Sequence, residues 1–260
     1  MQISLLGCGW LGLPLAETFL NDGHTVKGSV TSPEKVAVLQ SKGIQPYIID
    51  LNAISGDVMD DFLKCAEVFI IAIPPKARQN NGLPYPEKLQ GLLPFIKKAG
   101  IKKVLFTSST SVYADAPDIP VVTENTLPNP DTESGKQVLA AEQVLQSCAD
   151  FNTTVLRLGG LIGGDRHPVY HLAGRAALPN PDAPVNLADR DMIIEVVLKI
   201  VKRAIFGEVF VVVNPGHPAR KAYYTSEAEK RGLPLPEFSD DGNCVGKLVD
   251  GTAALKLLNL

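Results

Sequence analysis

The order of apolar and polar positions along the chain predicts alternating strands and helices. Short continuous apolar runs, such as residues 68–73, have the pattern of strands buried on both faces of a sheet. Longer segments with apolar residues three or four positions apart, as at Leu89, Leu92 and Ile96, have the pattern of helices. The expected strands span residues 2–6, 24–30, 45–50, 68–73, 103–108, 153–158 and 208–213, and the expected helices 11–22, 33–42, 85–99, 132–149, 189–204 and 222–231.

This alternation predicts an α/β fold with a Rossmann-like, doubly wound parallel β-sheet of about seven strands. Prolines crowd residues 168–184 and 215–236, which we expect to be loops that form a pocket. We therefore expect an NAD(P)-binding core over residues 1–160. Residues 161–260 would complete the sheet and form a small C-terminal substrate pocket, within the same compact unit and with a soft boundary.

Composition and charge narrow the classes of partner. A hydrophobic fraction of 45% and a net charge of -3 are those of a globular protein with no reason to bind nucleic acid or an anionic membrane. No apolar run approaches the roughly 20 residues of a membrane helix, and no basic segment precedes the first strand, so we expect a cytoplasmic protein. The four cysteines are scattered, which predicts neither a metal site nor a disulfide framework. The expected partner is a small-molecule substrate or ligand. By analogy with related folds, the long helices 86–98 and 132–149 suggest a homodimer.

A glycine-rich turn follows the first strand and carries the clearest chemical signal. Gly7, Gly9 and Gly12 have the spacing GxGxxG, between a strand and a helix. In such a loop the first glycine makes a tight turn, the second lets the backbone approach a pyrophosphate, and the third lets helix and strand pack closely. Trp10 and Leu11 complete the loop at the helix N-terminus, whose partial positive charge favours phosphate. The loop predicts a dinucleotide site; the alternative is a tight strand–helix turn without a ligand.

The residues after the second strand bear on the choice of cofactor. NAD sites commonly have a carboxylate at this strand tip, but here the sequence reads Thr31-Ser32-Pro33-Glu34-Lys35. The hydroxyls of Thr31 and Ser32 and the ammonium of Lys35 suit a 2′-phosphate, which predicts NADP(H), with NAD(H) as the alternative. Ser32 is equally suited to cap the following helix, with Pro33 at its first position.

Other segments add a resemblance to a known family. The runs Phe106–Tyr113 and Leu156–Gly163 resemble the fifth and sixth strands of the extended short-chain dehydrogenase/reductases, the NAD-dependent epimerase/dehydratase superfamily. More narrowly, Gly9–Gly12, Ser134–Lys136, Arg166–Pro168 and His217–Arg220 are similar to the YeeZ-type atypical subgroup. The resemblance places Ala72, Ser108 and Gly159 beside the cofactor and aligns Ser109 with the family's catalytic serine.

The chain departs from that family at its catalytic helix. The family has a Tyr that transfers the proton, and a Lys four positions later that lowers the pKa of this Tyr and binds the nicotinamide ribose. Here the ungapped alignment puts Ser134 and Val138 at these positions, and a register moved by two residues puts Thr132 and Lys136 there. Neither register supplies the Tyr, and positioned acid/base groups contribute roughly 10²–10⁴-fold to rate. The expected active site is therefore non-standard and lacks the Tyr-x-x-x-Lys pair.

Three residues are candidates for the missing chemistry. Ser109 matches the family's substrate-binding serine, and Tyr113 lies four residues further on. His167 follows the glycine-rich turn and is a side chain that exchanges protons near pH 7. The alternatives are a packing aromatic for Tyr113 and a surface turn for His167.

Three more residues are candidates for substrate binding. Lys76 and Tyr85 flank the loop after the fourth strand, where a substrate would lie, although a solvated loop is the alternative. Arg166 suits a carboxylate or phosphate, which its guanidinium binds with two hydrogen bonds.

Two functions fit these features. One is an NAD(P)-dependent oxidoreductase or epimerase-like enzyme that acts on an unknown small metabolite. The other is a non-catalytic sensor or regulatory protein that binds NADP(H). The missing Tyr and Lys favour the sensor, and the retained Ser109 with the elaborate C-terminal region favours the enzyme.

Overall fold

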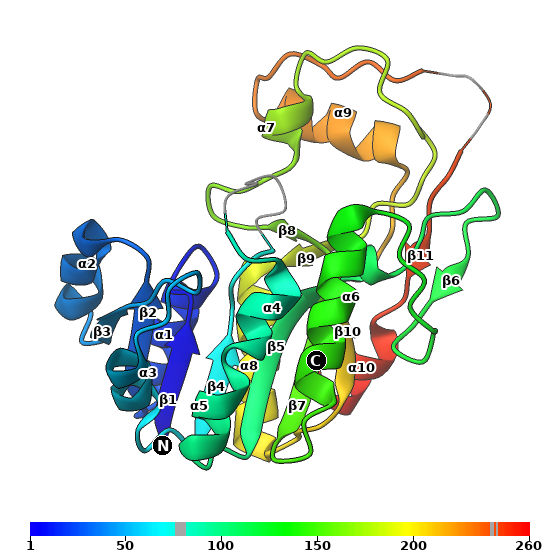
Figure 1. Cartoon of the computed structure of the whole chain (residues 1–260). Helices are drawn as coiled ribbons and strands as arrows, with labels where there is room; N and C mark the ends of the chain where they lie inside the picture. Colours follow the sequence, from blue (N-terminus) through cyan, green and yellow to red (C-terminus); the bar gives the residue numbers. More distant parts are fainter. Residues whose placement is uncertain (76–81, 240–241, 243) are drawn as a thin grey trace. The chain divides into compact units, whose positions relative to one another are not determined.

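A parallel seven-stranded sheet forms the centre of the fold (Figure 1). The computed structural model describes residues 1–260 except residues 76–81, 240–241 and 243. The strand order is β10-β7-β5-β4-β1-β2-β3. The strands are β1 (Gln2–Leu6), β2 (Thr25–Val30), β3 (Gln45–Ile48), β4 (Val68–Ile71), β5 (Lys103–Ser109), β7 (Asn152–Leu158) and β10 (Val209–Val212). The predicted Rossmann-like α/β fold is confirmed.

Helices and short strands complete the chain. The helices are α1 (Gly12–Asn21), α2 (Val36–Ser41), α3 (Gly56–Leu63), α4 (Tyr85–Gln90), α5 (Leu93–Lys98), α6 (Glu133–Gln146), α7 (Val169–Leu172), α8 (Arg190–Arg203), α9 (Arg220–Lys230) and α10 (Thr252–Leu257), with 3-10 turns η1 (Pro33–Lys35) and η2 (Thr110–Val112). The short strands β6 (Val121–Val122) and β11 (Leu248–Val249) pair with each other, as do β8 (Gly160–Ile162) and β9 (Leu187–Asp189). Within the described residues, no helix has the length and apolar character needed to cross a membrane.

The contacts divide the chain into two compact units whose segments alternate along the sequence. The first unit comprises residues 1–108, 133–156 and 194–209, and the second comprises residues 109–132, 157–193 and 210–260. The predicted division into residues 1–160 and 161–260, with a soft boundary inside one compact unit, stays a prediction. The assignment of a cofactor core and a substrate region stays a prediction.

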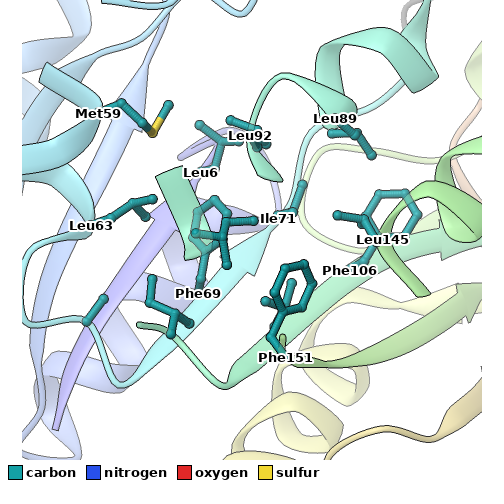
Figure 2. Packing of buried hydrophobic residues seen from close by; sticks show 14 of the residues in the cluster. Leu6, Met59, Leu63, Phe69, Ile71, Leu89, Leu92, Phe106, Leu145 and Phe151 are labelled. Atoms are coloured by element: carbon teal, nitrogen blue, oxygen red, sulfur yellow. The ribbon is translucent and has the colours of Figure 1, made fainter. Parts of the chain in front are cut away.

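Each unit has its own apolar core. In the first unit, alternate residues of the strands pack against α3, α4, α5 and α6, and Figure 2 shows Phe69, Ile71 and Phe106 at the centre of this cluster. Burial of side chains of this size contributes about 1.5–3 kcal/mol each. In the second unit, Val169 of α7 and Tyr224 of α9 belong to a smaller cluster with Val185 and Leu187. The large core of the first unit holds the carboxyl ends of β1, β2 and β4 in place, and these ends carry the site described below.

Several helical segments differ from the sequence prediction. The expected helix 85–99 is two helices, because Gly91 follows α4 and Pro94 lacks the N–H needed to continue a helix. Helix α3 was not predicted, although Met59, Phe62 and Leu63 form its buried face. Helix α7 lies within residues 168–184, which were expected to be loop, and helix α10 was not among the predicted helices.

Candidate cofactor site

The three glycines of the first loop have different surroundings. Gly7 has a φ of +103°, and a β-carbon there would lie 2.8 Å from the carbonyl oxygen of Ala72. A β-carbon on Gly12 would overlap the carbonyl oxygen of Gly7 and lie 2.9 Å from Leu5 Cδ2. A β-carbon on Gly9 would meet no atom within 4 Å. Packing therefore requires glycine at positions 7 and 12, whereas position 9 faces open space.

Gly9 is among the residues that line a cavity of about 550 Å³ in the first unit. This volume lies within the range of about 300–1,000 Å³ that is usual for small-molecule sites. The cavity is lined by the glycine loop, by the ends of β2, β3 and β4, and by residues of α4 and α6. Cys8 also lines it, and burial raises the pKa of the Cys8 thiol to about 12, so this thiol is protonated near neutral pH and a poor nucleophile.

The cavity gathers part of the predicted cofactor set. The predicted cofactor residues that line the cavity are Gly7, Gly9, Thr31, Lys35 and Ala72. The others, Trp10, Leu11, Gly12, Ser32, Ser108 and Gly159, are not among its lining residues, and Gly159 belongs to the second unit. Gly12 and Leu11 still shape the site, because they form the start of α1.

Two of the residues outside the lining have evident structural contacts. Ser32 precedes η1 with Pro33 at the first position, but its side chain makes no capping hydrogen bond, so the cap interpretation is wrong. Hydrogen bonds from the Glu34 backbone and the Ser32 side chain lower the pKa of Glu34. Ser108 is buried, and its hydroxyl donates to the carboxylate of Glu142, which is 0% exposed. The buried contact with Glu142 gives Ser108 a role in folding, whether or not it meets a ligand.

Among the predicted substrate residues of the first unit, the structure describes Tyr85. It lines the cavity, is 7% exposed and donates its hydroxyl to the carbonyl oxygen of Ile73 at 2.8 Å. Burial raises the pKa of Tyr85, so the phenol stays protonated at neutral pH. Lys76 lies outside the described residues.

Two of the proposed catalytic residues lie at the start of the second unit. The hydroxyl of Ser109 accepts a hydrogen bond from the Ser111 N–H at 3.1 Å and so caps η2. Tyr113 is 1% exposed, donates its hydroxyl to the carbonyl oxygen of Thr123 at 2.9 Å and accepts from Arg157 at 2.6 Å. These contacts favour the packing interpretation of Tyr113, and a catalytic role stays a prediction.

His167 is also enclosed by its own unit. It is 7% exposed, and its Nδ1 accepts from the Val169 N–H at 3.2 Å, so its Nε2 carries the proton and points at the Tyr223 hydroxyl, 3.0 Å away. Burial, together with the charge of Arg231, lowers the pKa of His167, and Glu227 acts in the opposite direction. The neutral imidazole thus joins α7 to α9.

Arg166, the last predicted substrate residue, is exposed, and its backbone pairs with that of Gly163 in both directions at 3.1 Å. This backbone pairing closes the turn after β8. Binding of a carboxylate or phosphate there stays a prediction.

The lining residues that the sequence reasoning missed include two polar pairs. Asp50 and Asn52 follow β3, and one carboxylate oxygen of Asp50 accepts from the backbone and side-chain nitrogens of Asn52, each at 2.9 Å. Glu133 and Gln137 project from α6, one helical turn apart. The first pair could have been found from the sequence, because both residues lie at or just beyond the end of a predicted strand. The second pair depends on the rotation of α6, which the sequence does not reveal.

The second unit has a cavity of its own, of about 390 Å³. Its polar lining residues are Thr110, Asp115, His171, Asn180, Asn186, Arg220, Tyr224 and Lys247. Lys247 is bound to Asp115 at 2.8 Å, and Arg220 lies over the ring of Phe238 at 6.0 Å. Among the described residues, no group of three or more His, Cys, Asp and Glu side chains is arranged to hold a metal ion.

Sequence comparison defines the class to which this fold and loop belong. The sequence model of the NAD(P)H-binding family matches residues 7–202, which include the glycine loop and most of the sheet. The chain therefore belongs to the NAD(P)H-binding family.

A particular relative is Protein YeeZ of Escherichia coli strain K12. The two are 33% identical over 258 residues, which cover 96% of this chain and 92% of YeeZ. The predicted resemblance to the YeeZ-type subgroup is thereby confirmed.

Solved structures share the fold. UDP-glucuronic acid 4-epimerase from Bacillus cereus, in complex with NAD, superimposes with a TM-score of 0.80 at 19% identity, over 100% of this chain and 92% of that chain. MoeE5 in complex with UDP-glucose and NAD superimposes with a TM-score of 0.80 at 19% identity, over 100% of this chain and 93% of that chain. The chain has the NAD(P)-binding, epimerase/dehydratase-like fold.

Proposed function

We propose that the cavity of the first unit binds NADP(H), and that the protein is an oxidoreductase or epimerase-like enzyme acting on a small metabolite. The observation that carries the proposal is the open space at Gly9, between two glycines that packing fixes. Backbone N–H groups at the start of a helix favour a phosphate, and of the three loop glycines Gly9 is the one with no atom close to its β-carbon position. A bound nicotinamide supplies hydride exchange.

The end of the cavity formed by β2 and β3 suits the adenosine half of the cofactor. Thr31 and Lys35 both line it there, and Lys35 supplies a positive charge for a 2′-phosphate. The carboxylate of Asp50 is nearby in the lining but already accepts two hydrogen bonds from Asn52. These observations support a preference for NADP(H) over NAD(H).

The proton-transfer groups are part of the proposal and are non-standard. Ser134, aligned with the family's Tyr, does not line the cavity, and Val138, aligned with its Lys, is 2% exposed. Neither side chain offers an acid or base with a pKa near neutrality. Ser109 and His167 stay the residues to test first for a role in turnover.

The second unit supports the binding of a small polar metabolite. Its cavity presents Arg220, Lys247 and His171, which suit an anionic group, beside the amide of Asn180. Of the two solved structures above, MoeE5 was determined in complex with UDP-glucose, and the Bacillus cereus protein is named as a UDP-glucuronic acid 4-epimerase. An anionic, hydroxyl-bearing metabolite is therefore the substrate class we propose.

Transfer of isotope from NADPH tests turnover separately from binding. Protein incubated with NADPH deuterated at the nicotinamide and with a metabolite extract should produce a deuterated product detectable by mass spectrometry. When the Lys35→Met variant replaces the wild type, deuterium transfer should decrease by about the same factor as the affinity for NADPH. Absence of label in every metabolite, with NADPH bound, would contradict the enzyme.

A non-catalytic NADP(H) sensor is the second candidate. It is favoured by the hydroxyl of Tyr113 and both ring nitrogens of His167, which are engaged in contacts inside the second unit. For a sensor, NADPH should change the protease sensitivity of the second unit without label transfer. An unchanged cleavage pattern on NADPH binding would count against it.

A further inference from the structure

Helix α6 presents a carboxylate and an amide to the cavity of the first unit. Glu133 and Gln137 lie four positions apart, so their side chains share one face of the helix, and both line the cavity. The Nε2 of Gln137 donates to Glu133 Oε1 at 3.0 Å. The neighbouring positions differ, since Ser134 is absent from the lining and Val138 is buried.

This pair has a definite chemical character. The hydrogen bond uses one amide N–H and one carboxylate oxygen, which leaves the second carboxylate oxygen and the amide oxygen as acceptors. The amide holds the carboxylate by an i, i+4 contact, so less side-chain freedom is lost when a ligand arrives. The pair is therefore anionic and rich in acceptors, and it favours a ligand group that carries positive charge.

The position of the pair indicates which part of a dinucleotide it meets. Among the lining residues, Thr31, Lys35 and Asp50 come from the β2 and β3 ends, whereas Glu133, Gln137 and Lys88 come from α6 and α4. Figure 1 shows α2 and β3 at one side of the first unit and α4 beside α6 at the other. If the adenosine half lies at β2 and β3, as the proposed function requires, the nicotinamide half extends toward α6.

We propose that Glu133, held by Gln137, makes this cavity favour the oxidised, cationic nicotinamide over the reduced, neutral one. The oxidised ring carries one positive charge and the reduced ring none, while the phosphates and riboses are the same in both forms. The carboxylate therefore attracts the oxidised ring selectively, and its repulsion of the phosphates cancels in the comparison. Lys88, which lines the same end, acts in the opposite direction.

The size of the effect follows from exposure. Glu133 is exposed, and exposed charge pairs contribute a twofold to fivefold change in affinity, roughly. A fivefold preference for the oxidised form lowers the reduction potential of the bound cofactor by about 20 mV, since tenfold corresponds to about 30 mV for a two-electron couple. The reduced cofactor would then be a slightly stronger hydride donor when bound to the site than when free in solution.

The experiment compares two dissociation constants in each of several variants. Calorimetric titrations with NADP⁺ and NADPH give the ratio of their dissociation constants in the wild type. Glu133→Gln keeps the shape and the hydrogen bond to Gln137 but removes the charge, so it should shift this ratio twofold to fivefold toward NADPH, roughly. Lys88→Met should shift it the other way. Gln137→Ala should move the ratio in the same direction as Glu133→Gln, by less.

Glu87→Gln is the matched control, because Glu87 is exposed on α4, carries the same charge and does not line the cavity. Its ratio should equal that of the wild type. A ratio in Glu133→Gln equal to that in Glu87→Gln would overturn the inference while leaving cofactor binding intact. Failure of the wild type to bind either form would instead overturn the proposed function, so the two failures are distinguishable. Circular dichroism of each variant confirms its folding.

Discussion

Replacement of Gly9 by Ala separates the binding function of the glycine loop from its structural function. A methyl group at this position meets no protein atom within 4 Å, and its φ is not in the left-handed region, so the fold accommodates it. Loss of glycine freedom in the unfolded chain even favours the variant by about 0.4–1 kcal/mol. If a pyrophosphate lies against the glycine loop, as we propose, the same methyl group obstructs its approach to the backbone. Displacement of charge-assisted hydrogen bonds worth about 1.5–3 kcal/mol each predicts at least a tenfold loss of NADPH affinity.

The assay combines urea unfolding with calorimetric titration of NADPH. Gly9→Ala should unfold at the wild-type urea concentration or slightly above it, and should bind NADPH at least about tenfold more weakly. Gly12→Ala is the contrasting variant, because its methyl group overlaps the Gly7 carbonyl oxygen and should destabilise the fold by roughly 1–3 kcal/mol. Wild-type NADPH affinity in a folded Gly9→Ala protein would refute the placement of the phosphates at this loop.

Three further variants test other parts of the structure. Lys35→Met should weaken NADPH by about tenfold and leave NADH unchanged by titration, and equal losses for both would contradict the 2′-phosphate contact. Ser108→Ala removes the donor to the buried Glu142 carboxylate and should lower the free energy of unfolding in urea by roughly 1.5–3 kcal/mol; an unchanged midpoint would show that this contact is not stabilising. The pKa of His167 is lower in the folded state than in the unfolded chain, so its contribution to stability is present above pH 6.5 and is lost as the pH falls from 6.5 toward the folded value. His167→Gln should flatten that part of the stability curve, and a wild-type slope would refute the assignment.

The sheet could be predicted because each of its strands is recognisable from its own short run of apolar residues. Val68–Ile71 is apolar throughout, as only a strand covered on both faces requires, and the glycine loop follows a strand that is equally clear. Helix α3 was harder, because its buried face rests on three residues within an eight-residue segment. The break between α4 and α5 was visible in Gly91 and Pro94 but was outweighed by the apolar period that continues through both helices.

The part of the candidate site that depends on the backbone of the glycine loop could be predicted. The part that depends on how helix α6 is rotated about its axis could not. Gly7 and Gly9 have their places because the loop itself makes the turn and opens the cavity. Alignment of α6 drew attention to Ser134 and Val138, whereas the helix turns Glu133 and Gln137 toward the cavity. Successive residues of a helix are rotated by about 100° about its axis. An error of one residue in the alignment therefore assigns the wrong face of the helix to the cavity.

Titration of the purified protein with NADPH and then with NADH is the most direct test of the account. Calorimetry gives both dissociation constants, and the fluorescence of Trp10, the single tryptophan of the chain, reports on changes at the glycine loop to which it belongs. The account predicts that both cofactors bind, that NADPH binds about tenfold more tightly through Lys35, and that Gly9→Ala abolishes most of the binding. Absence of heat and of fluorescence change with either cofactor would contradict a working dinucleotide site in the first unit.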